Sequence, residues 1–174
     1  KASPDLSVGC HVVLIDGEPV LDPSRIATIT DSRRFRDRLK TFAARALTGR
    51  MNAREIETEA SAQIQKIQSA GIAVSHVDTH KHTHIFPQVL RPLLRAARDC
   101  GVRALRNPFG PRFPLRSSQL LTRPNLWTRF AEIRILSRFA GQFRRAVDRE
   151  GFVTPDGTLG IEVTGSLDET LFQA

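Results

Sequence analysis

Two hydrophobic periods alternate along the chain and divide it into predicted strands and helices. Residues 8–15 alternate and are rich in β-branched side chains, as in a strand, whereas apolar residues between 56 and 67 recur at helical spacing. The same patterns predict strands over Val8–Ile15, Ala73–Asp78, Val102–Leu105 and Leu159–Thr164, and helices from Asp31 or Ser32 to Leu47, from Asn52 to Gly71, from Pro87 to Cys100 and from Pro124 to Glu150.

Local signals at the ends of these elements support the assignment. Asn52 is a helix cap that Glu55 completes as a capping box, and Gly71 ends that helix. Pro87 is suited to the first position of the next helix, which Pro92 should kink or start later. Asp16 with Gly17 marks a turn after the first strand.

The alternation of strands and helices predicts an α/β fold with a mainly parallel sheet. With 174 residues, 40% of them hydrophobic, the chain can bury one core but not two, so we expect a single domain over 1–174. Functional sites in such folds form at the carboxyl ends of the strands. The candidate residues fall at or near those ends: His11, Asp78, His80, His84, Arg106, Asn107 and Thr164.

The histidine distribution indicates where chemistry should be sought. Four of the five histidines lie between His76 and His84, and the fifth is His11, about seventy residues earlier. Neutral imidazole is the commonest protein metal ligand, so the pattern favours a metal site assembled from two segments. A surface histidine cluster is the alternative interpretation.

Spacing within the histidine run limits its geometry. Every second residue from 76 to 84 is His or Asp, but residues two apart in a strand are separated by roughly 6.5 Å, so they cannot all reach one ion. We therefore expect the strand to end near Asp78 or His80. A zinc-protease helix would place His80 and His84 one turn apart, but Lys81 stands where the catalytic glutamate belongs.

Charge is the third informative feature, because the chain carries a net charge of +8. The segment Arg103–Arg149 contains eleven arginines, no lysine, and only Glu132 and Asp148 as acids. Such a block can contact nucleic acid, an anionic membrane surface or an acidic substrate, or can form a solvated helix face. It lacks the aromatic interleaving of single-strand binders and any recognised nucleic-acid motif, so no nucleic acid is expected as a partner.

Cysteine use and hydropathy bear on location. Cys10 and Cys100 have no CxxC spacing and lie beside apolar residues, which favours reduced thiols in a cytoplasmic protein. The sequence contains no apolar run of about 18 residues, as a membrane-spanning helix would need. We therefore expect a cytoplasmic protein, with membrane association limited to peripheral contact through the arginine block.

Several motifs together resemble the YdjC-like (ChbG) carbohydrate deacetylases. They are Val8–Leu14, Gly17 with Pro19, His76–His84 and Phe86–Val89, within a resemblance that runs from about Ser7 to Glu169. Lys81 and the segment Gly160–Glu169 are most similar to the hopanoid-biosynthesis-associated branch, HpnK. That branch implies deacetylation of an N-acetylglucosaminyl hopanoid lipid.

The resemblance implies an irregular (β/α) barrel and one divalent metal ion, magnesium or zinc. Carried over to this chain, the two histidine ligands are His11 and His80, while the aspartate of the family's Asp-Asp-x-Gly motif has no counterpart. A full barrel takes about 250 residues, so the chain is expected to be a fragment lacking N- and C-terminal strands, and inactive by itself.

Roles for the remaining candidates follow from the same chemistry. An open metal site activates water and polarises the acetamide carbonyl. Asp78 would hold an imidazole N–H in the correct tautomer, and His84 would serve as a supporting group or acid. Arg106, Asn107 and Thr164 are candidates for contact with substrate hydroxyls. A noncatalytic metal-binding domain and a nucleic-acid-binding protein remain as alternatives, and a homodimer is left open.

Overall fold

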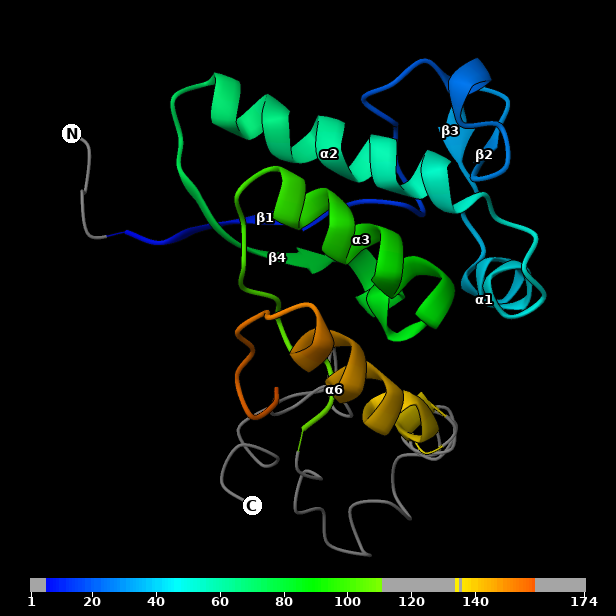
Figure 1. The fold of residues 1–174 in the computed structure, drawn as a ribbon. Helices are drawn as coiled ribbons and strands as arrows, with labels where there is room; N and C mark the ends of the chain where they lie inside the picture. Colours follow the sequence, from blue (N-terminus) through cyan, green and yellow to red (C-terminus); the bar gives the residue numbers. More distant parts are fainter. Residues whose placement is uncertain (1–5, 111–133, 135, 159–174) are drawn as a thin grey trace, which may run out of the picture.

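Two parallel strands, β1 (Val8–Val12) and β4 (Val74–Thr79), lie at the centre of the fold (Figure 1). The computed structural model describes residues 6–110, 134 and 136–158. Single parallel bridges extend the sheet from Val77 to Leu105 and from Ala104 to Val153. The parallel arrangement predicted from the sequence is thus confirmed, although the expected strand over 102–105 is reduced to bridges.

Helices α2 (Ala53–Ser69) and α3 (Pro87–Asp99) pack against each other, and α2 also contacts both strands (Figure 1). α3 in turn contacts α1 (Leu39–Leu47) and α6 (Ala140–Arg149). The helical stripe predicted for α2 is buried at Ile56, Ala60 and Ile64. On the strands, Val12 and Val77 enter this core, because successive side chains of a strand point to opposite faces.

The helix predicted from residue 31 or 32 begins only at Leu39, so that part of the prediction is wrong. Residues 30–35 instead form a hairpin of β2 (Thr30–Asp31) and β3 (Arg34–Phe35), after the 3₁₀ helix η1 (Pro23–Arg25). Phe35 is buried, and its backbone N–H donates to the Gly17 carbonyl. This contact with a distant segment outweighs local helix propensity.

Asn52 caps α2 as predicted, by accepting from the N–H of Arg54 at 2.9 Å. The capping box is wrong, because Glu55 accepts from the N–H and hydroxyl of Thr28 at 2.8 and 2.7 Å. The Asn52 N–H donates to that same hydroxyl at 2.9 Å. Thr28 therefore joins the helix start to the preceding loop.

Helix α3 starts at Pro87 and continues through Pro92, so its start is not displaced. The predicted helix 124–150 is represented in the described residues by the 3₁₀ helix η3 (Ser137–Phe139) and by α6. The predicted strand Leu159–Thr164 lies outside them. Within the ranges described, no helix combines the length and apolarity that crossing a membrane requires.

Two glycines allow the 107–110 loop to pass directly over residues 157–158. A Cβ on Gly157 would meet the Phe109 carbonyl oxygen, and would lie 2.6 Å from the Cα of Gly110. Both contacts are with backbone, which cannot move aside as a flexible side chain can. The contact also holds residues 155–158 against the end of the sheet.

Gly157→Ala should therefore lower the free energy of unfolding by about 1–3 kcal/mol, the usual effect of overpacking. Gly141→Ala is the matched control, because its Cβ would meet only Arg145 Nη1, at 3.5 Å, within a helix. That change should leave stability unchanged or raise it by up to about 1 kcal/mol. Urea denaturation followed by circular dichroism measures both, and equal effects would contradict the backbone-contact argument.

Candidate metal centre

Register in the central sheet sets His11 opposite Asp78. The two residues are paired across β1 and β4, and His11 Nδ1 lies 2.7 Å from Asp78 Oδ1. A carboxylate accepts, so Nδ1 carries the proton and Nε2 of a neutral His11 presents a lone pair. The His11 side chain is 52% exposed and that of Asp78 16%. His11 therefore presents an accessible imidazole whose tautomer is set by Asp78.

His80 supplies a second imidazole from the other strand. β4 ends at Thr79, as predicted, and His80 opens the 3₁₀ segment η2 (His80–Ile85). Its Nδ1 lies 3.4 Å from His11 Nε2, and the two rings meet edge to face. Two nitrogens bound tetrahedrally to one zinc ion at 2.0–2.1 Å are about 3.3 Å apart. The pair therefore has the spacing for a shared ion, and equally for a weak N–H···N hydrogen bond.

His80 is suited to ligation at neutral pH. Burial, followed by the nearby His11 and Lys81, holds its pKa below the ordinary value for histidine. A lowered pKa keeps the ring neutral, and only the neutral ring binds a metal ion.

The backbone after His80 is held in an uncommon conformation. Lys81 and His82 have φ values of 53° and 52°, in the left-handed region that residues other than glycine seldom adopt. This geometry excludes the α-helical arrangement of His80 and His84. Lys81 Nζ bonds Asp16 Oδ2 at 2.9 Å, and Asp16 also has a positive φ, of 56°. The ion pair joins the loops that follow β1 and β4, and it lowers the pKa of Asp16.

His84 lies in the protein interior and not among the exposed groups around His11 and His80. The side chain is completely buried, with Nδ1 2.6 Å from Thr79 Oγ1 and Nε2 3.0 Å from the Arg106 carbonyl oxygen. A carbonyl only accepts, so Nε2 carries the proton and Nδ1 accepts from Thr79. Burial lowers the pKa of His84 to about 4. With both nitrogens engaged, the residue is placed to support the site, not to protonate a substrate.

Arg106 reaches the site, whereas Asn107 does not. Arg106 Nη1 lies 3.4 Å from Asp78 Oδ2, the oxygen away from His11. Asn107 is 1% exposed and donates to the carbonyls of Pro155 and Asp156 at 3.1 and 2.9 Å. Its side chain thus secures the 155–158 segment, which argues against the predicted contact with substrate.

Thr164, the remaining substrate candidate, lies outside the described residues. A depression of about 350 Å³ adjoins the histidine pair on the side of α2. Its polar lining outside the histidines comes from Asp16, Glu18, Gln63 and Lys66. This depression is open to solvent and borders both imidazoles.

Two residues near the site were missed as candidates in the sequence. In the sequence Asp16 marks only a turn, because its ion pair with Lys81 depends on the fold. The Nδ1 atom of His82 is buried, and no partner for it occurs among the described residues. Burial, followed by the charge of Arg106, lowers the pKa of His82. The run of histidines from 76 to 84 was enough to mark His82 as a candidate, but the spacing of the run does not show which of its histidines lie close together in the fold.

The donor set is incomplete in the part of the chain that the structure describes. Across residues 6–110, 134 and 136–158, no group of three or more His, Cys, Asp or Glu is arranged to hold a metal ion. His11 and His80 fit two positions of such a site, and Asp78 contacts His11 from behind. Any further ligand of these residue types would have to come from outside the described residues.

Buried His84 predicts a loss of stability in mild acid. Its folded pKa of about 4 lies below the unfolded value of 6.5, so protons bind the unfolded chain first. Its contribution is complete above pH 6.5 and is lost as pH falls toward 4, at up to about 1.4 kcal/mol per pH unit. Denaturant titrations across this range should show a shallower pH slope in His84→Gln, but an unchanged slope in His76→Gln. An identical slope in all three proteins would contradict the assignment.

Comparison with known proteins points to sugar deacetylases. A carbohydrate deacetylase of Brevibacillus brevis is 33% identical over 103 residues, covering 57% of this chain and 37% of that protein. One from Listeria monocytogenes is 42% identical over 80 residues (46% and 31%), and a chitooligosaccharide deacetylase of Yersinia enterocolitica is 35% identical over 97 (55% and 36%). The matched region thus spans about a third of the length of these relatives.

The fold has a counterpart among solved structures. A crystal structure from Enterococcus faecalis, provisionally named a cellobiose-phosphate cleavage protein, superposes with a TM-score of 0.53 at 15% identity. The superposition covers 88% of this chain and 77% of that one, and at this identity it bears on the fold alone. The model of the YdjC-like protein family matches residues 1–174, the whole of the sequence. This chain is a member of the YdjC-like family.

Proposed function

We propose that this chain carries part of the active site of a metal-dependent hydrolase that removes the N-acetyl group from an amino sugar. The observation that carries the proposal is the facing pair His11 Nε2 and His80 Nδ1, 3.4 Å apart, with Asp78 behind His11. The relatives named as carbohydrate and chitooligosaccharide deacetylases support the reaction class. The ion would be magnesium or zinc.

Within this proposal, His11 and His80 are two of the metal ligands. A bound divalent ion supplies a water of lowered pKa and polarises the acetamide carbonyl. Asp78 holds His11 in the tautomer that exposes Nε2, while Arg106 contacts the other oxygen of the same carboxylate. A further carboxylate ligand and the general base are not assigned to residues of this chain.

The remaining candidates either hold His80 in position or contact the substrate. His84 supports the turn of η2 by joining Thr79 to the Arg106 carbonyl, which keeps His80 next to His11. The Lys81–Asp16 ion pair secures the same turn from the solvent side. Substrate hydroxyls would be bound by Arg106 and Thr164, and by Glu18 and Lys66 in the adjoining depression.

Three finer assignments belong to the same proposal. The order β1, β4, residues 104–105 and residue 153, with helices between them, supports an irregular (β/α) barrel. The motif resemblance at Lys81 and 160–169 supports an N-acetylglucosaminyl hopanoid lipid as the substrate. A lipid-linked sugar would bring the protein to a membrane surface, and a chitooligosaccharide would not.

Metal content tests the histidine pair. The full-length gene product should hold about one divalent ion per chain, and His11→Ala and His80→Ala should each weaken binding by at least about tenfold because each removes a ligand. Elemental analysis and calorimetric titration measure this. His76→Ala is the matched control, because His76 is exposed on β4 and its one hydrogen-bond partner among the described residues is the neighbouring Ser75 hydroxyl. Full metal retention in both ligand variants would refute the site.

Acetate release tests the reaction. The metal-loaded full-length protein should release acetate from a chitooligosaccharide or from an N-acetylglucosaminyl hopanoid, and the ratio of the two rates assigns the substrate. His80→Ala should lower kcat/KM by at least about a hundredfold, since water activation depends on the ion. Metal bound at the histidines without acetate release from either substrate would favour a noncatalytic metal-binding domain.

A further inference from the structure

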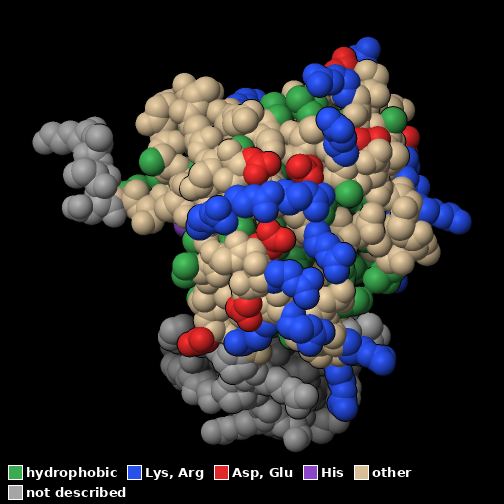
Figure 2. Space-filling view, in the orientation of Figure 1, with side chains coloured by type: hydrophobic (Ala, Val, Ile, Leu, Met, Phe, Trp, Pro, Cys, Tyr) green, Lys and Arg blue, Asp and Glu red, His purple; other side chains and the backbone are tan. Residues whose placement is uncertain are grey.

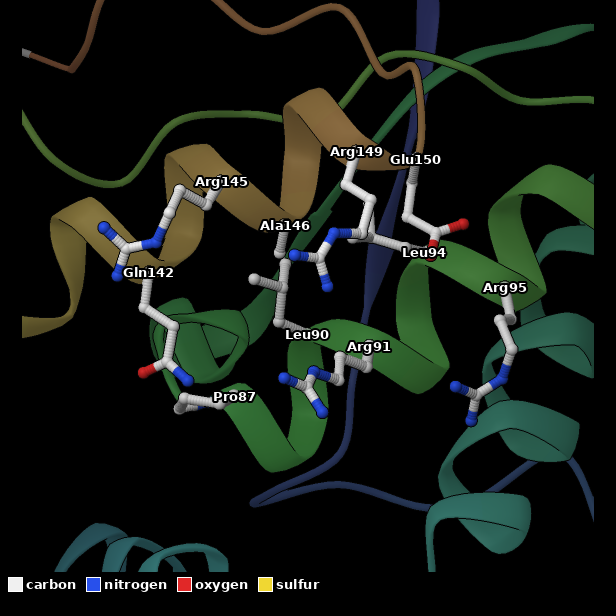
Figure 3. A pocket seen from close by; sticks show the side chains of 10 residues that line it. All are labelled: Pro87, Leu90, Arg91, Leu94, Arg95, Gln142, Arg145, Ala146, Arg149 and Glu150. Atoms are coloured by element: carbon white, nitrogen blue, oxygen red, sulfur yellow. The ribbon is translucent and has the colours of Figure 1, made fainter.

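A second, separate hollow of about 250 Å³ lies between α3 and α6 (Figure 3). Arginines border both sides of it, Arg91 and Arg95 from α3, and Arg145 and Arg149 from α6. On each helix the two arginines are four residues apart, and therefore lie on one face. The groove shares no lining residue with the depression beside His11 and His80.

Glu150 lines this groove and Glu57 lies beside it, and both are paired with arginines other than Arg91, Arg145 and Arg149. Arg95 bonds Glu57 at 2.6 Å, and Glu150 bonds Arg98 at 2.9 Å. Within the described ranges, no ion pair or hydrogen-bond acceptor is found for the guanidinium groups of Arg91, Arg145 and Arg149. Three positive charges without a partner among the described residues thus border one hollow.

Two of these three charges, those of Arg91 and Arg149, face the space between the helices, whereas the Arg145 guanidinium extends away from them. Figure 3 shows the guanidinium groups of Arg91 and Arg149 between the two helices, over Leu90. Figure 2 shows the basic side chains forming a continuous band across this face of the molecule. Like charges gathered at a concave surface repel each other, and an anion between them removes that cost.

The other lining residues narrow the kind of anion. Leu90 and Leu94 form a buried aliphatic base, Gln142 adds an amide and Glu150 a carboxylate, and none of the described residues that line the groove is aromatic. Without rings for base stacking, the groove is poorly suited to single-stranded nucleic acid. Its volume fits one or two tetrahedral oxyanions, and the planar fork of arginine matches phosphate oxygens in bidentate geometry.

We propose that the α3–α6 groove is a binding site for a phosphate ester, held by Arg91, Arg145 and Arg149. The phosphate belongs either to a free phosphorylated molecule or to the headgroup of an anionic lipid, and the recognition chemistry is the same for both. The proposal does not depend on the deacetylase reaction, because it rests on other residues.

The test compares two triple variants of the full-length protein with equal change in charge. Arg91→Gln, Arg145→Gln and Arg149→Gln together alter the groove. Arg33→Gln, Arg38→Gln and Arg54→Gln together form the control, because these three side chains are exposed and lie outside the groove. Calorimetry with inorganic phosphate and pyrophosphate measures free anions, and co-sedimentation with phosphatidylcholine vesicles, with and without phosphatidic acid, measures headgroups.

The groove variant should lose at least about tenfold in affinity for the phosphate probe, and the control should stay within about twofold of the wild type. Binding of pyrophosphate with this selective loss identifies a soluble ligand, and binding only of phosphatidic acid vesicles identifies a lipid headgroup. An equal loss in both variants, or no binding of any phosphate probe, overturns the proposal. The circular dichroism spectra and the urea denaturation midpoints of both variants should match those of the wild type, which shows that they are folded.

Discussion

The parallel pairing of β1 with β4 is the constraint on which the candidate site depends. It brings His11 and Asp78, 67 residues apart in sequence, within 2.7 Å of each other. A shift of one residue in this register would turn one of the two side chains to the opposite face of the sheet. The buried Val12 and Val77 oppose such a shift, because it would bring them to the surface. Core packing therefore sets the geometry of the polar groups.

Around this pair, the structure combines a strained turn with polar contacts that hold it. Two consecutive left-handed residues, Lys81 and His82, direct His80 back toward His11. Such backbone geometry is maintained only where the surroundings determine it. Here the buried His84 holds the turn from below, and the Asp16–Lys81 ion pair holds it from the solvent side. The backbone of the turn is thus strained, and this conformation places the His80 imidazole next to His11.

The α3–α6 groove shows a different use of charge. Near the histidines, charged groups are paired, as with Asp78 between His11 and Arg106 and with Asp16 and Lys81. In the groove, four arginines gather, while Glu57 pairs with Arg95 and Glu150 with Arg98. The first arrangement suits the metal site that we propose, and the second leaves a positive potential that the proposed phosphate ester would neutralise.

Much of the framework could be predicted from the sequence, because strand and helix periods are local properties. The start of β1, the cap at Asn52 and the start of α3 at Pro87 all agree with the structure. The β2–β3 hairpin could not be predicted, because it depends on contacts with residues 16–17. The capping box failed for a similar reason, since Thr28, from a distant loop, takes both partners.

For the site, the sequence indicated which segments to consider. The concentration of histidines after a predicted strand selected residues 76–84, and the family resemblance selected His11 and His80 as the proposed ligands. Only the tertiary structure decided the part that each residue takes, because that depends on burial and on neighbours distant in sequence. His84 and Asn107 are buried and bond the Arg106 and Pro155 carbonyls, while Asp16 and Arg106 reach the site through ion pairs with Lys81 and Asp78. A one-dimensional pattern records residue types and spacings, and the distances between side chains arise only when the core closes.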